Sequence, residues 1–304
     1  MTATGVETSV SRLLFLHAQT PVHPGSGAAL DVIDLPVQRE RHTQWPTVPG
    51  STLKGILRDA CRRRNGDAEK EAWLAAFGPE TQHADKHAGA LAVTDARILA
   101  FPVRSLRGVF AWATCSAVLD RLRRDTALAN GAAGLPATVP APGRNECACA
   151  ADSPLLVDGR RVVLEEFELS RKEDSAAAEW AAWIARHGLA DEPSRERFAS
   201  HLVVLDDDQF THFVRHATEV VARIGLDYEK KTVKKGALFY QEFLPAETLF
   251  YALVFANRSR RETHANDAAG IMQYVADGIP KVLQIGGDET TGKGICAVSL
   301  SPTS

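Results

Sequence analysis

Residues 13–18 read LLFLHA and residues 49–64 read PGSTLKGILRDACRRR, and these two stretches set how the fold begins. The first is an apolar run with the length of a buried strand. In the second, Leu53 and Ile56 recur at helical spacing, and Ser51 can act as the N-cap of the helix. The sequence therefore predicts a buried strand and an amphipathic helix, separated by a long connection.

That connection is unusual in length and in composition. Between Pro21 and Gly50 it contains five prolines and three glycines. Irregular loops of this length in compact domains are generally either functional or disordered. We expect this loop to have a function, because its composition is too specific for a plain connector.

Hydrophobic periodicity predicts the later elements. Helices are expected over residues 68–77, 118–128, 176–186, 209–221 and 265–275, and strands over 90–99, 108–114, 162–169 and 248–256. Residues 222–228 and 232–240 flank the polar turn Glu229–Lys231 and predict an exposed hairpin. We interpret Asp206, Asp207 and Asp208 as N-cap and helix-dipole partners rather than as a metal site.

The order of these elements favours an α+β fold with a ferredoxin-like core over a doubly wound sheet. Residues 130–143 are rich in glycine, alanine and proline, and they predict a flexible excursion rather than a domain boundary. The sequence contains no visible internal repeat. We therefore expect one domain over residues 1–304.

Composition is ordinary for a soluble globular protein, with 45% hydrophobic and 24% charged residues among 304. No uncharged apolar stretch is long enough for a membrane span, and the N-terminus lacks the pattern of a signal peptide. Five scattered cysteines argue against a disulfide framework and favour a reducing cytoplasm.

The formal net charge of −3 gives no indication of a nucleic-acid partner. The distribution of charge does, because residues 38–64 contain seven Lys or Arg against two acids. The amides of Gly50 and Ser51 at a helix N-terminus attract phosphate, and Lys54 and Arg58 lie one turn apart on that helix. These features predict an RNA-facing groove, against the alternative of a solvated helix face.

Two other patterns resemble known sites without completing them. Residues 287–294 read GDETTGKG, close to a phosphate-binding loop, but Gly294 stands where Ser or Thr would hold magnesium, so we do not predict an NTP site. The pairs His83/His87 and His212/His216 have helical i, i+4 spacing, and Cys147 and Cys149 lie elsewhere. We favour surface or capping histidines over a zinc site, because two ligands do not make one.

Several blocks together are similar to the Cmr-type (type III-B) CRISPR effector backbone subunits of the RAMP superfamily. The blocks are HPGSG at residues 23–27, DVIDLPVQRERH at 31–42, PGSTLKGILR at 49–58, FPVRSLRGVF at 101–110, GALFYQE at 236–242 and LQIGGDETTGKG at 283–294. The resemblance extends over the length of the chain. Its last block matches the glycine-rich loop of the superfamily.

The resemblance implies a modified RNA-recognition-motif (RAMP) core with long insertions, including a thumb-like β-hairpin near residues 221–240. It implies copies that stack along a guide (CRISPR) RNA, together with other effector subunits, in the cytoplasm and without a membrane. It also implies cutting of complementary target RNA where the thumb distorts the duplex. The family reaction needs a divalent metal ion, magnesium or manganese, and leaves a cyclic phosphate and a 5′-hydroxyl.

The resemblance also suggests site residues. The essential aspartate of the family matches Asp34, while Asp31 beside it receives no role. A carboxylate of ordinary acidity is a weak general base at neutral pH, so we favour Asp34 as a metal-orienting residue, with His23 and Glu242 as catalytic helpers. The predicted RNA-binding residues are Gln38, Arg39, Arg41, Ser51, Lys54, Arg58, Arg104, Gly286, Gly287, Gly292, Lys293 and Gly294.

Two alternatives remain open at this point. The chain can be a non-catalytic scaffold that binds the guide and recruits other subunits, or a guide-processing endonuclease of a related RAMP branch. The acid at position 34 favours an enzyme over a scaffold. The thumb-like insertion favours a backbone subunit over a guide-processing enzyme.

Overall fold

The computed structural model describes residues 9–28, 32–66, 69–83, 85–129, 134–227, 229–261, 263–264 and 266–301. Asp31, residues 130–133 and the ends of three predicted elements, at residues 68, 228 and 265, lie outside these ranges.

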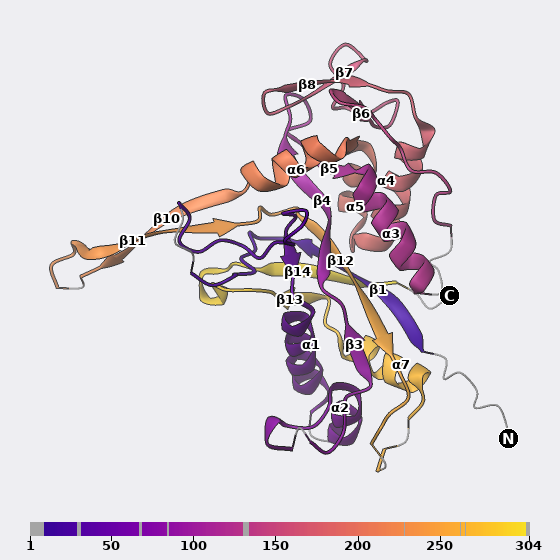
Figure 1. Cartoon of the computed structure of the whole chain (residues 1–304), viewed down its shortest axis with the longest axis vertical. Coiled ribbons are helices and arrows are strands. Elements are labelled where there is room, and N and C mark those ends of the chain that lie inside the picture. The colour runs from indigo at the N-terminus through magenta and orange to yellow at the C-terminus, as the bar shows by residue number, and fades with distance from the viewer. Residues whose placement is uncertain are drawn as a thin grey trace.

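Short runs of strands and of helices follow one another along the chain (Figure 1). The strands are β1 Val10–Ala18, β2 Thr47–Val48, β3 Leu91–Val93, β4 Ala96–Arg104, β5 Phe110–Cys115, β6 Glu146–Ala148, β7 Arg161–Leu164, β8 Phe167–Arg171, β9 Leu202–Leu205, β10 Glu219–Leu226, β11 Val233–Phe243, β12 Leu249–Ala256, β13 Val282–Gln284 and β14 Ile295–Leu300. The helices are α1 Gly50–Asn65, α2 Lys70–Phe77, α3 Ser116–Leu128, α4 Ser175–Gly188, α5 Glu192–His201, α6 Asp207–His216 and α7 Ala268–Gly278, with short 3₁₀ turns at Thr81–His83 and Glu289–Thr291.

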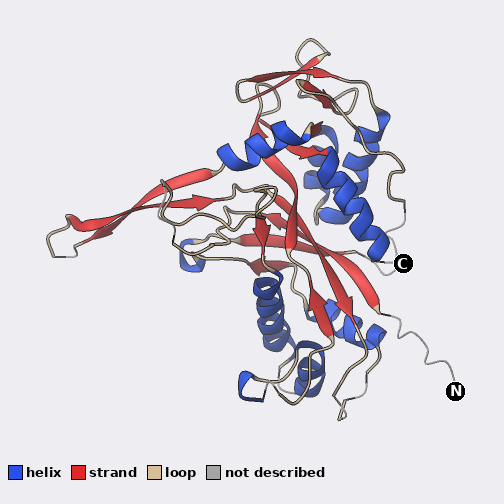
Figure 2. Cartoon of the chain, in the orientation of Figure 1, coloured by secondary structure: helices blue, strands red, loops and turns tan. Residues whose placement is uncertain are grey.

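One large mixed sheet forms the centre of the molecule (Figure 2). Its strand order is β13-β14-β1-β12-β4-β5-β9-β6-β8-β7, and β2 and β3 add to β4 and β12. Neighbours are antiparallel except for the parallel pairs β5–β9 and β6–β8. Strand β1 has a neighbour on each edge, and the helices α4 and α7 contact it, so its apolar run Leu13–Leu16 is buried.

Helices pack against this sheet in two groups (Figure 1). The helices α1, α2 and α7 contact one another, and α7 also contacts β1 and β12. The helices α4 and α5 form a pair, and α4 packs on β1, β9 and β14. Among the described residues, no helix has the combined length and apolar character that a bilayer crossing requires.

A two-stranded hairpin, β10–β11, projects away from the rest of the molecule (Figure 2). Because side chains alternate along a strand and Ile224 pairs with Leu238, these two lie on one face together with Val220 and Tyr240. All four are between 41% and 54% exposed. We call this set the apolar face of the hairpin. Large exposed apolar patches generally mark interaction sites.

The predicted α+β class is confirmed, and most predicted elements are present with shifted ends. The strand predicted over residues 162–169 is wrong, because Glu165 adopts φ 47° and folds the segment into the hairpin β7–β8. The helix predicted to Val221 ends earlier, at His216. Helix α5 was not predicted from the sequence. Asp206 caps α6 as expected, accepting from the amides of Asp208 and Gln209.

The expected cap of α1 is also wrong. The N-cap residue is Pro49, and Ser51 lies within the helix. The amide of Gly50 instead donates to Asp95 Oδ1 at 2.7 Å, so the turn between β3 and β4 supplies the cap. A carboxylate at a helix N-terminus is stabilising. It also occupies one of the donors that the sequence assigned to phosphate.

Candidate functional site

The irregular segment that follows β1 lies against β11 and the residue after it. Val22 forms an isolated bridge with Leu244, and Leu35 forms a parallel bridge with Gln241. Within the segment, Gly25 bridges to Val37. The second contact places the Asp34 loop at the edge of the projecting hairpin.

Asp34 is fixed by the backbone of β11. Its Oδ2 accepts from the amide of Tyr240 at 2.7 Å, and the carbonyl of Tyr240 accepts from the amide of Leu35 at 3.0 Å. This pair of bonds sets the direction of the carboxylate. Asp34 is partly exposed, and the described residues place no donor on its second oxygen, so that oxygen can meet an external partner.

His23 is buried between three segments. Its Nδ1 donates to the carbonyl of Glu242 at 2.6 Å, and its ring packs on Phe243 with centroids 5.5 Å apart. Its own carbonyl accepts from the amide of Gly287 at 3.1 Å. With 7% of its surface exposed, His23 ties the glycine-rich loop to β11. Its predicted help in catalysis stays a prediction.

Glu242 is also buried, and both of its carboxylate oxygens are bound. Oε2 accepts from the amide of Val37 at 2.9 Å, and Oε1 lies 2.6 Å from the guanidinium of Arg39. Arg39 also donates to the carbonyls of Gln44 and Val214. A buried carboxylate needs such pairing. The geometry therefore supports a positioning role for Glu242, and it commits Arg39 to internal bonds.

The glycine-rich loop between β13 and β14 packs on the His23 segment. A side chain at Gly286 would bring a Cβ within 2.3 Å of the His23 carbonyl oxygen, and one at Gly294 within 2.1 Å of the Ile285 carbonyl oxygen. Both positions have positive φ. Only glycine fits such close backbone approach. The loop is thus a rigid support beside the base of the hairpin, where Gly287 and Gly292 are exposed.

On α1 the two predicted RNA-binding residues, Lys54 and Arg58, differ in how many contacts they make within the protein. Arg58 donates to the carbonyls of Phe77, the last residue of α2, and of Pro79, which follows the helix. Its guanidinium lies 4.2 Å from the centroid of the Trp73 ring. Burial, and then the nearby charge of Arg58, lower the pKa of Lys54. Lys54 is therefore the better candidate for a phosphate contact, because Arg58 is held in place against α2.

The remaining predicted residues do not form one cluster. Arg41 and Ser51 are exposed, and Gln38 is partly exposed with its backbone bonded to Pro24 and Thr47. Arg104 is exposed at the end of β4, where its carbonyl accepts from Glu165 in the β7–β8 turn. The structure thus brings together His23, Asp34, Glu242 and the glycine-rich loop, and leaves Arg104 apart from them.

The donor set near Asp34 limits how a metal ion can bind. Within the described ranges, no group of three or more His, Cys, Asp or Glu side chains is placed to hold an ion. Magnesium, however, is commonly bound by one or two carboxylates while keeping waters and substrate phosphates. A single outward carboxylate oxygen fits that mode of binding. It does not fit an enclosed metal site.

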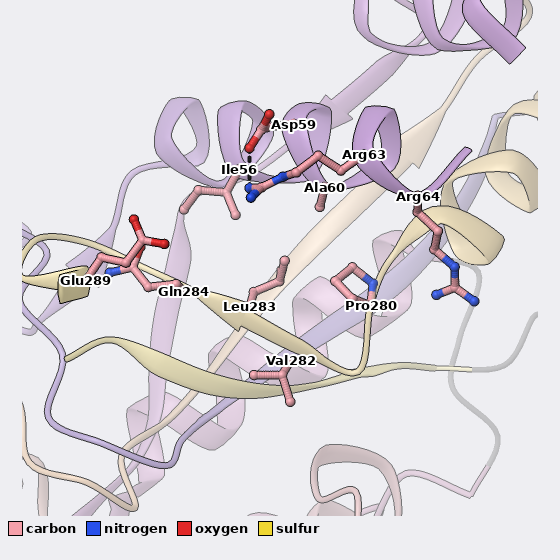
Figure 3. A pocket seen from close by; sticks show the side chains of 10 residues that line it. All are labelled: Ile56, Asp59, Ala60, Arg63, Arg64, Pro280, Val282, Leu283, Gln284 and Glu289. Atoms are coloured by element: carbon pink, nitrogen blue, oxygen red, sulfur yellow. Dashed lines mark hydrogen bonds and ion pairs between the residues drawn. The ribbon is translucent and has the colours of Figure 1, made fainter. Parts of the chain in front are cut away.

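A groove of about 600 Å³ lies elsewhere, between α1 and the edge strand β13 (Figure 3). Its apolar lining includes Ile56, Ala60 and Leu283, and Arg63 and Glu289 are among its charged lining residues. Neither Asp34 nor His23 contributes to it. The candidate chemistry is therefore on an open surface, as suits a substrate that binds along the protein.

Some residues of the site could not be identified from sequence reasoning. Tyr240 holds Asp34 through its backbone amide, which no side-chain pattern signals. Asp288 accepts from Arg223 and from Gln241 of the hairpin. The one available signal for Asp288 was an acid among glycines in residues 286–294.

The sequence matches the RAMP superfamily over residues 15–297. It is also similar to the Pyrococcus furiosus protein described as CRISPR system Cmr endoribonuclease Cmr4, with 39% identity over 289 residues that cover 95% of each chain.

Solved structures show the same similarity. The structure of oligomeric Cmr4 from Pyrococcus furiosus superimposes with a TM-score of 0.75 at 30% identity, covering 97% of this chain and 98% of that one. A chain of the type III-B Cmr-beta complex bound to cognate target RNA has a TM-score of 0.74 at 20% identity, with 96% and 97% covered. The second likeness supports the fold alone.

Proposed function

The chain belongs to the RAMP superfamily and, within it, to the Cmr4 family, and on this premise we propose that it is a guide-RNA-binding backbone subunit of a type III-B CRISPR complex that cuts complementary target RNA. Several copies stack along the guide, together with other subunits. The observation that carries the proposal is the Asp34 carboxylate, held at the edge of an exposed hairpin by the amide of Tyr240.

An open surface site suits this substrate. A guide–target duplex is too large for an enclosed pocket, and the Asp34 loop lies beside a hairpin whose apolar face is exposed. An apolar wedge can unstack a nucleotide at a cost of a few kcal/mol per step. Tyr240 is on that face, and its backbone holds Asp34. The wedge and the acid are therefore in fixed register.

Unstacking supports the chemistry that we propose. The ribose 2′-oxygen bonds to phosphorus while the bond from phosphorus to the 5′-oxygen breaks. A proton leaves the 2′-hydroxyl, and a proton joins the departing 5′-oxygen, so the products are a cyclic phosphate and a 5′-hydroxyl. Placing the attacking and leaving oxygens in line is the main requirement of this step. A stacked A-form duplex does not satisfy it.

In this proposal Asp34 orients the reacting phosphate region. A divalent ion, when bound, would supply charge stabilisation at the developing oxyanion. Asp34 would contribute one carboxylate oxygen to that ion, with water and RNA as the other ligands. His23 and Glu242 act through position, because both hold the segment on which Asp34 lies.

Guide binding is assigned to the glycine-rich loop and to Lys54. Exposed Gly287 and Gly292 carry no side chains, so an RNA backbone can approach the loop closely, although their amides donate to the carbonyls of His23 and Glu289. Lys54 adds positive charge on α1, within a segment that is basic overall. Affinity for RNA then depends mostly on backbone contacts and falls with salt.

Co-purification tests the proposal directly. We expect the complex assembled in its host to contain RNA fragments of uniform guide length, identified by sequencing. We also expect it to cut RNA complementary to the guide at regular intervals, leaving cyclic phosphate ends. Bound RNA of random length would reject guide binding. Uniform guides without cutting would leave the chain a scaffold subunit.

A further inference from the structure

Asp288 has an unusual backbone for a residue that is not glycine. It adopts φ 65° and ψ 30°, in the left-handed region, within the glycine-rich loop. Its carboxylate bridges two side chains: Oδ1 lies 3.0 Å from Arg223 and Oδ2 lies 2.6 Å from Gln241. Asp288 and Arg223 are 19% and 26% exposed at their side chains, so the ion pair is largely shielded from water.

The two partners of Asp288 come from different strands of the hairpin. Arg223 is on β10 and Gln241 is on β11, and the register places them diagonally on the face opposite the apolar one. Phe243 lies on the same face, with Arg223 5.4 Å and Lys293 5.1 Å from its ring centroid. The glycine-rich loop therefore holds both strands at the base of the hairpin (Figure 1).

Gln241 also connects this contact to Asp34. Its side chain donates to Asp288, while its backbone pairs with Leu35, the residue that follows Asp34. The adjacent amide, of Tyr240, donates to Asp34 itself. A continuous set of hydrogen bonds thus runs from the glycine-rich loop through β11 to the Asp34 carboxylate.

We propose that Asp288 is a positioning residue that holds the Asp34 site in place from the glycine-rich loop. Asp288 fixes the two strands at the hairpin base, and β11 in turn fixes Asp34. Efficient target cutting then depends on the Asp288 contacts. This inference rests on the proposed function.

The identity of the residue supports a role for the carboxylate. Glycine adopts positive φ at no steric cost, whereas a residue with a Cβ does so less readily. Aspartate and asparagine are the better tolerated of these. An aspartate at this position therefore keeps the loop conformation and adds two oxygens that reach the hairpin. If positive φ were the only requirement at this position, glycine would satisfy it equally well.

Asp288→Asn is the appropriate test because asparagine tolerates the same backbone conformation. Its amide oxygen can still accept from Gln241, but the ion pair with Arg223 is lost. In the assembled complex we expect target cutting at saturating target to slow by about tenfold, since small misplacements reduce rates strongly. We expect guide affinity to change by less than about twofold, because the substitution removes an ion pair inside the protein and leaves the phosphate contacts intact.

A double-mutant cycle separates positioning from a general structural effect. Arg223→Gln alone should slow cutting to a similar extent, and Asp288→Asn combined with Arg223→Gln should be no slower than either. Asp158→Asn is a matched control, since Asp158 also has positive φ and pairs with an arginine, Arg161, near β7. It should cut normally. Additive losses in the cycle would overturn the proposal.

The remaining outcomes are also decisive. If Asp288→Asn lowers guide affinity as much as cutting, Asp288 is a guide contact and the positioning role is wrong. Asp34→Asn in the same assay keeps the two proposals distinct. Normal cutting by Asp288→Asn with loss of cutting by Asp34→Asn removes only the present inference. Normal cutting by Asp34→Asn removes the proposed site itself.

Discussion

The guanidinium of Arg39 lies 2.6 Å from the carboxylate of Glu242, and their side chains are 15% and 4% exposed. The pair joins the loop that follows β1 to the end of β11, the second strand of the hairpin. Because 203 positions separate the two residues, this contact holds the candidate site together across most of the chain.

Removing Arg39 should destabilise the protein. We expect Arg39→Ala to lower the free energy of unfolding by about 3 kcal/mol, because it leaves the Glu242 carboxylate buried without its partner. Denaturant unfolding followed by circular dichroism measures the change. Arg161→Ala is the comparison, since its ion pairs are exposed, and it should lower the free energy of unfolding far less. Equal losses in the two variants would contradict the role of the buried pair.

Asp34→Asn should abolish target cutting while leaving folding, assembly and target binding nearly unchanged. Asparagine keeps the size of the side chain and can still accept from the amide of Tyr240, but it removes the charge that a metal ion needs. Cutting is measured on labelled complementary RNA, and binding by gel shift. Continued cutting at regular intervals would return the chain to the scaffold class. Failure to assemble would instead indicate that Asp34 mainly caps its turn.

The apolar face of the hairpin should be needed for cutting but not for stability. Ile224 and Leu238 are 52% and 54% exposed, so replacing both with serine removes little buried area. We expect the double variant to cut target about tenfold more slowly, because the nucleotide is no longer held in line. Val221→Ser, on the opposite face, is the control. A similar loss in the control would exclude a specific wedge.

Lys54→Glu should weaken guide binding for all guide sequences and reduce its salt dependence. Loss of one phosphate contact lowers the magnitude of the slope of log K against log salt by about 0.7 to 0.9. Burial and Arg58 lower the pKa of Lys54, while a neighbouring phosphate raises it. Guide binding therefore takes up protons and weakens as the pH rises through that pKa. Lys172→Glu, just after β8, is the control and should leave the salt slope unchanged. If Lys54→Glu also leaves the salt slope unchanged, α1 is not part of the RNA interface.

The turn at Glu229–Lys231 should exchange its amide hydrogens rapidly in the isolated protein and slowly in the RNA complex. The hairpin has exposed side chains on its apolar face and few partners beyond its base. Hydrogen exchange detected by mass spectrometry measures this. Strong protection of the turn without RNA would contradict the prediction.

The spacing of apolar residues along the sequence was enough to predict the strands and helices with long apolar patterns, such as β1, α1 and β12. They failed where a single backbone angle decides the structure, as at Glu165, whose positive φ divides one predicted strand into two. They also failed at the start of α1, because its cap comes from Asp95, 45 positions away. Local patterns carry no information about a partner so distant in sequence.

The candidate site shows the same limit. Residue types and the family resemblance made Asp34, His23 and Glu242 candidates, and the structure places these three around the base of the hairpin. The sequence could not show that Arg58 donates to carbonyls at the C-terminal end of α2, because this contact depends on how α1 packs against α2. It also could not show that Asp288 reaches the hairpin, because the contact spans 65 positions to Arg223.

The pairing of β1 limits when the large sheet can form during synthesis. Its two neighbours are β12 and β14, at residues 249–256 and 295–300, so β1 stays unpaired until more than 200 further residues have been made, and its second edge waits for β14. An unpaired apolar strand is a template for aggregation. A chain truncated before β14 therefore leaves one edge of β1 exposed and lacks the strand that pairs with β13 beside the glycine-rich loop.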